Sequence, residues 1–86
     1  MKLSQIIKVA YLESEKALKK NEVPVGAVIF NDKEIISKAH NLVIKNNDPL
    51  AHAEYIAIKK AVKKLKTNNL KGYKTVSYTH LTLPTT

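Results

Sequence analysis

The chain has 86 residues, 44% of them hydrophobic, so we expect one small globular unit and no second domain within it. Its net charge of +8 comes from fifteen lysines and no arginine against seven acidic residues. Cysteine is absent, which excludes a disulfide scaffold and removes the commonest zinc donors.

The N-terminal region is predicted to be an amphipathic helix over residues 3–20, because its apolar residues recur at spacings of three and four. Lys8 interrupts the apolar residues, so we expect neither a signal peptide nor a membrane span, and a cytoplasmic protein. Asn21 is the expected C-cap. Pro24 prevents further helix and favours an extended Val23.

A β-hairpin is predicted next, with strands over residues 25–30 and 34–40 joined by a turn at Asn31 and Asp32. Gly26 within the first strand indicates a bulge or a close approach by a ligand or another backbone. His40 is expected to end the second strand. A polar loop over residues 41–49 follows.

A second helix is predicted with Asp48 as N-cap and Pro49 as its first residue, ending at about residue 65. Its expected buried stripe is Ile58, Ala61, Val62 and Leu65. The opposite face carries Lys59, Lys60, Lys63, Lys64 and Lys66. A third strand is expected over residues 73–78. The aromatic residues expected in the core are Tyr11, Phe30, Tyr55 and Tyr73.

The lysines have two explanations. They could serve a polyanionic partner such as RNA, which would release counterions and relieve the repulsion between lysines four residues apart. They could also form an ordinary solvated face in a protein rich in lysine, asparagine and isoleucine, a composition typical of AT-rich genomes. We favour the solvated face.

His52 and Glu54 combine an imidazole that can bind a metal with a carboxylate that can move protons. In a regular helix such residues point about 200° apart, so they can share a site only at the mouth of the second helix. A structural explanation also exists, in which both simply favour a helix N-terminus. A catalytic zinc ion needs about three protein ligands, and His40 and His80 are poor replacements for missing thiolates.

Residues 22–28, Glu-Val-Pro-Val-Gly-Ala-Val, together with Asn41 and residues 48–54, Asp-Pro-Leu-Ala-His-Ala-Glu, resemble the bacterial tRNA adenosine deaminases over residues 1 to about 76. Cytosine, guanine and riboflavin-pathway deaminases share His-Ala-Glu, whereas residues 22–28 resemble the tRNA-acting branch. The resemblance implies a three-layer α/β/α cytidine-deaminase-like fold and a homodimer. It also implies one Zn²⁺ per subunit and hydrolysis of wobble adenosine to inosine in a tRNA anticodon loop.

The same resemblance implies a role for each matching residue. His52 would be the zinc ligand and Glu54 the proton shuttle. Asn41 would hydrogen-bond the flipped base, since an amide offers a donor and an acceptor together. The remaining substrate-binding residues would be Val23 and Ala53, lining the base pocket, and Glu22, near the nucleotide.

The chain departs from the family at its C-terminal end. The family continues with Thr-Leu-Glu-Pro-Cys-x-x-Cys, whereas residues 82–86 read Thr-Leu-Pro-Thr-Thr. We therefore expect residues 1–76 to be the N-terminal part of a zinc-dependent deaminase domain, truncated after the second helix and the start of the third strand. Residues 77–86 would be an anomalous tail from a frameshift, fusion or assembly error, and the 86-residue chain would be inactive.

Two other functions stay open. One is a guanine or cytosine deaminase of the same superfamily, since His-Ala-Glu does not distinguish these substrates. The other is a basic RNA-binding or dimerisation module without catalysis.

Overall fold

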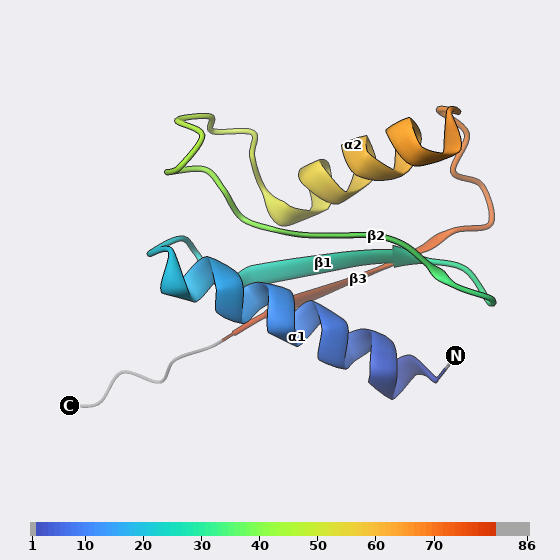
Figure 1. The fold of residues 1–86 in the computed structure, drawn as a ribbon, viewed down its shortest axis with the longest axis horizontal. Coiled ribbons are helices and arrows are strands. Elements are labelled where there is room, and N and C mark those ends of the chain that lie inside the picture. Colours follow the sequence, from blue (N-terminus) through green and yellow to red (C-terminus); the bar gives the residue numbers. More distant parts are fainter. Residues whose placement is uncertain (1, 81–86) are drawn as a thin grey trace.

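The computed structural model describes residues 2–80. The elements in chain order are α1 (Leu3–Lys19), β1 (Val25–Phe30), β2 (Ile35–His40), α2 (Ala53–Leu65) and β3 (Lys74–Thr79). The strands form one antiparallel sheet in the order β2-β1-β3. The two helices cover opposite faces of this sheet (Figure 1). The predicted three-layer α/β/α arrangement is therefore confirmed for the described part of the chain.

The predicted hairpin is confirmed as β1 and β2. The Asn31 side chain closes its turn, because Oδ1 accepts the N–H groups of Lys33 at 2.9 Å and Glu34 at 2.8 Å. The register shifts at the Phe30 end, where β2 carries one extra residue. The opposite end of the hairpin is regular, and Asn41, one of the candidate site residues, follows β2 there.

Gly26 lets α1 lie directly against β1. A Cβ atom at this position would overlap the carbonyl oxygen of Ala10 and lie 2.7 Å from the backbone nitrogen of Ser14. Of the two explanations for this glycine, the close approach of another backbone is therefore correct. The α1 face of the core is built from Ile6, Ala10, Val28 and Phe30.

The other face of the sheet packs against three fully buried alanines of α2, Ala53, Ala57 and Ala61. Their spacing of four places them in one stripe, and their small side chains let the helix approach the strands closely. Ser37 of β2 reaches across and donates to the Ala57 carbonyl at 2.7 Å. The predicted stripe was wrong at Ile58, which is 42% exposed, because large apolar residues were preferred to alanines.

The predicted start of the second helix was also wrong. The N–H of Leu50 binds Asp48 Oδ1 at 2.9 Å, and the N–H of Ala51 binds the Asp48 carbonyl at 3.0 Å, so the residues after Asp48 form turns. A hydrogen bond of 2.9 Å from the Leu42 N–H to the Ala51 carbonyl fixes these turns against the preceding loop. The helix begins only at Ala53, with His52 as its N-cap.

The remaining expectations concern the chain ends and the aromatic residues. The predicted C-cap of the first helix was wrong by one residue: the C-cap of α1 is Lys20, and Asn21 follows it with φ of 59°. Phe30 is buried, but Tyr55 is 42% exposed, so its assignment to the core was wrong. β3 pairs with β1 as far as Thr79, and residues 81–86 of the predicted tail lie outside the described residues. Neither described helix is long and apolar enough to cross a membrane.

Candidate functional site

The predicted site residues come from segments that meet at one end of the sheet. β1 begins there, β2 ends there and α2 starts there (Figure 1). His52 has an extended backbone, with φ of −76° and ψ of 155°, and its side chain is exposed. Glu54 is exposed in the first turn. Because His52 lies before the first residue of α2, the angle of about 200° between residues two apart in a regular helix does not apply to His52 and Glu54.

Asn41 joins the end of β2 to the start of α2. It is only 3% exposed, and its Oδ1 accepts the N–H of Ala53 at 2.7 Å. Its own N–H donates to the Val25 carbonyl at 3.2 Å. An N–H group requires an acceptor, so Oδ1 must face the helix and the NH₂ group is the part left for a ligand. Asn41 can therefore offer its NH₂ group to a base, while its Oδ1 is bound to the start of α2.

Glu22 is buried and holds the loop that follows β2. Its carboxylate accepts the N–H groups of Ile44 at 2.9 Å and Lys45 at 2.8 Å. Burial raises the pKa of Glu22, but these two hydrogen bonds and the nearby His40 and Lys20 lower the pKa by more, so it lies below its usual value. Both carboxylate oxygens thus bind backbone, and a place near a nucleotide stays a prediction.

Val23 and Ala53 differ in accessibility. Val23 is 62% exposed on the segment before β1, whereas Ala53 is fully buried against the sheet. The strand end beside Val23 is fixed because the His80 N–H donates to the Pro24 carbonyl at 2.8 Å. Val23 therefore has surface to offer a substrate, and the predicted role of Ala53 in a pocket wall stays a prediction.

One contact of Glu54 was missed from the sequence. Ser77 of β3 donates its hydroxyl hydrogen to Glu54 Oε1 at 2.9 Å. No sequence signal identifies this pair, because it depends on how β3 lies beside α2. The contact orients the carboxylate that was predicted to move protons.

A buried carboxylate lies behind the site. Glu13 of α1 is 4% exposed, and its two oxygens lie 3.0 Å from His40 Nδ1 and 2.7 Å from Lys16 Nζ. Burial raises the pKa of Glu13, but the hydrogen bonds from His40 and Lys16 outweigh it, so the pKa is lowered overall. Lys20 Nζ lies 3.0 Å from His40 Nε2. A lysine can only donate, so Nε2 accepts, Nδ1–H donates to Glu13, and both ring nitrogens are engaged.

The residues present do not fit a complete zinc centre. Within residues 2–80, no three His, Cys, Asp or Glu side chains come together in a way that could hold a metal ion. A catalytic zinc ion needs about three protein ligands. The chain has no cysteine, and His40 is occupied by Glu13 and Lys20. His52 is therefore a single candidate ligand.

Comparison with known proteins identifies close relatives. The chain is 54% identical over 66 residues to a tRNA-specific adenosine deaminase of Aquifex aeolicus, a match that covers 77% of this chain and 44% of that protein. It is 46% identical over 66 residues to the Bacillus subtilis protein of the same name, with 77% and 41% covered. The chain thus spans less than half the length of these curated relatives.

Solved structures give the same fold. One, from a study of A-to-I editing by tRNA:A34 deaminases at the wobble position of transfer RNA, matches with a TM-score of 0.83 at 31% identity. It covers 86% of this chain and 57% of that one. Guanine deaminase from Bacillus subtilis matches with a TM-score of 0.82 at 34% identity, covering 90% and 50%.

The family model for the cytidine and deoxycytidylate deaminase zinc-binding region matches residues 1–82. This range contains every residue of the site described above. The predicted family is confirmed, and with it a zinc ion in the complete protein. The chain belongs to the cytidine and deoxycytidylate deaminase family.

Proposed function

We propose that this chain is part of a tRNA adenosine deaminase, which hydrolyses wobble adenosine to inosine in a tRNA anticodon loop. The observation that carries the proposal is the 54% identity to the Aquifex aeolicus protein of that name. We propose a homodimer in the cytoplasm, with Zn²⁺ bound by His52 and by donors that residues 2–80 do not supply. Residues 1–76 would form the deaminase part and residues 77–86 an anomalous tail.

The residues of this chain would divide the work of binding and proton transfer. Glu54 would take up and return a proton at its carboxylate. The free NH₂ group of Asn41 would donate to a ring nitrogen of the flipped base. Val23 and Ala53 would line the base pocket. Glu22 would act near the nucleotide by fixing the loop that it binds.

A chimera tests this function directly. This chain replaces the matching part of the Aquifex aeolicus protein, and inosine is measured in transcribed tRNA. We expect zinc-dependent inosine formation, lost in Glu54→Gln, which keeps the shape of the side chain but removes its basicity. Glu34→Gln, in the distant hairpin turn, is the matched control. A folded chimera that forms no inosine, or that keeps full activity with Glu54→Gln, would contradict the proposal.

The 86-residue chain itself should be inactive because, within residues 2–80, no further side chain joins His52 to hold a metal ion, and the chain has no cysteine. Inosine formation by the purified chain with added zinc would show that this reasoning is wrong.

Guanine deamination is the second candidate, favoured by the match to the Bacillus subtilis guanine deaminase. Ammonia release by the chimera from free guanine, with none from tRNA, would support it. The opposite result would exclude it for this chain.

A further inference from the structure

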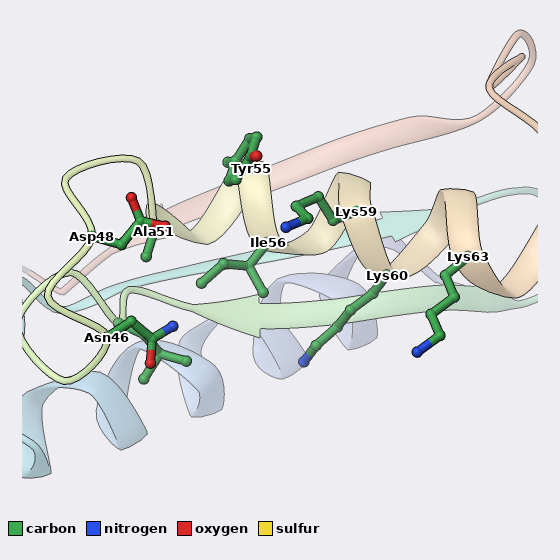
Figure 2. Close-up of a pocket in the computed structure, with 9 residues that line it drawn as sticks. Asn46, Asp48, Ala51, Tyr55, Ile56, Lys59, Lys60 and Lys63 are labelled. Atoms are coloured by element: carbon green, nitrogen blue, oxygen red, sulfur yellow. The ribbon is translucent and has the colours of Figure 1, made fainter.

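A groove of about 290 Å³ lies between α2 and the loop that precedes it, beside the candidate site (Figure 2). Its lining combines an apolar floor with a basic rim. The residues used here are Leu42, Tyr55, Ile56, Lys59, Lys60 and Lys63. Leu42 directly follows Asn41 and Ala51 directly precedes His52, so the groove adjoins the candidate site at the start of α2, whereas Glu54 faces β3 on the other side of the helix.

Some of the lysines on α2 are held by backbone, which an ordinary solvated face does not require. Lys60 Nζ donates to the Lys38 carbonyl at 3.2 Å, and Lys64 Nζ donates to the Ile36 carbonyl at 3.4 Å. Lys60 and Lys64 are four residues apart, a rise of about 6 Å along the helix, and Lys38 and Ile36 are two residues apart, about 6.6 Å along the strand. The two lysines can therefore reach both carbonyls of β2. An ammonium group has three protons, so Lys60 keeps donors for a ligand after binding β2.

Tyr55 adds an exposed aromatic ring to this basic surface. It is 42% exposed, and Lys59 Nζ lies 5.3 Å from the centre of its ring. Exposed aromatic rings beside cations are typical of surfaces that bind single-stranded nucleic acid, where bases stack on the rings and phosphates meet the cations.

We propose that this groove binds the sugar–phosphate backbone of single-stranded RNA that flanks the candidate site. The charge of the chain supports this occupant: it is +8 overall, and the groove has three lysines against one acid, Asp48. Asp48 Oδ1 accepts the Leu50 N–H at 2.9 Å at the loop side, so the anion would lie along the helix side. A bound phosphate chain would also relieve the repulsion between Lys59 and Lys63, one turn apart. The inference rests on the proposed function, which supplies RNA as partner.

The experiment measures binding of a fluorescent RNA hairpin to the 86-residue chain over a range of salt concentrations. Lys59→Gln/Lys63→Gln removes two groove charges that make no hydrogen bond within residues 2–80. Lys8→Gln/Lys19→Gln removes two exposed charges from α1, on the other face of the sheet, and is the matched control. Each lost phosphate contact lowers the slope of log K against log[salt] by about 0.7 for a single strand, so the groove variant should lose about 1.4. The control should keep its slope.

Three further measurements make the result decisive. Far-UV circular dichroism should be the same for both variants, and Lys59→Arg/Lys63→Arg should keep the original slope. Equal slopes in both glutamine variants, or no measurable binding at low salt, would overturn the proposal. A hairpin without adenosine in its loop should show the same groove dependence. RNA binding therefore reports on the groove, whereas inosine formation by the chimera reports on the function.

Discussion

Asn41→Ala is expected to lower the free energy of unfolding by about 2 kcal/mol. The substitution removes the acceptor, 2.7 Å away, of the N–H group of Ala53, which is fully buried at the start of α2. A buried donor left without a partner costs about 1–3 kcal/mol. For a small domain that loses about 1 kcal/mol of stability per molar urea, the midpoint of unfolding should fall by about 2 M.

Two variants separate the structural role of Asn41 from its predicted role in base binding. Asn41→Asp keeps an acceptor of the same shape at a helix N-terminus, so its urea midpoint should stay closer to that of the original chain. It lacks the NH₂ donor, so inosine formation by the chimera should still fall. Asn46→Ala, in the same loop, should shift the midpoint by less than about 0.5 M. An unchanged midpoint for Asn41→Ala would refute the capping argument.

Three other variants test separate parts of the structure. Gly26→Ala should destabilise the chain by about 3 kcal/mol in urea, because its methyl group would overlap the Ala10 carbonyl; a neutral effect would contradict the close packing of α1. The pKa of Glu22 is lowered on folding, so its stabilisation is complete above its usual pKa of 4.5 and is lost as pH falls through the lower folded value. Glu22→Gln should therefore lose less stability than the original chain between pH 5 and pH 2, and identical losses would contradict this. β2 is an edge strand, and Lys60 and Lys64 bind two of its carbonyls. Lys60→Gln/Lys64→Gln should uncover these carbonyls and raise self-association, measured by light scattering. Unchanged scattering would show that the two lysines do not protect this edge.

The local parts of the fold could be predicted from the sequence. The first helix and the hairpin follow from apolar spacing, from Pro24 and from the turn at Asn31, all of which act between near neighbours. The start of α2 could not be predicted, because the N–H of Ala53 binds the side chain of Asn41, a residue twelve positions earlier that reaches the helix only in the folded chain. Asp48 has the right side chain for a cap but binds the N–H of Leu50 instead.

In the candidate site, too, local sequence patterns could be predicted and contacts between distant residues could not. His52 and Glu54 could be identified from their pattern, which is local in the sequence. Ser77 could not, because its contact with Glu54 needs the position of β3 beside α2. Glu22 was identified, but its hydrogen bonds to the Ile44 and Lys45 backbone appear only when the loop folds over it.

The zinc content of purified protein most directly tests whether His52 belongs to a metal site that this chain cannot complete. After gel filtration in buffer without added metal, the 86-residue chain should carry no stoichiometric zinc. The chimera with the Aquifex aeolicus protein should retain zinc and lose it with His52→Ala. Stoichiometric zinc held tightly by the 86-residue chain, or a chimera whose zinc is unaffected by His52→Ala, would contradict the account.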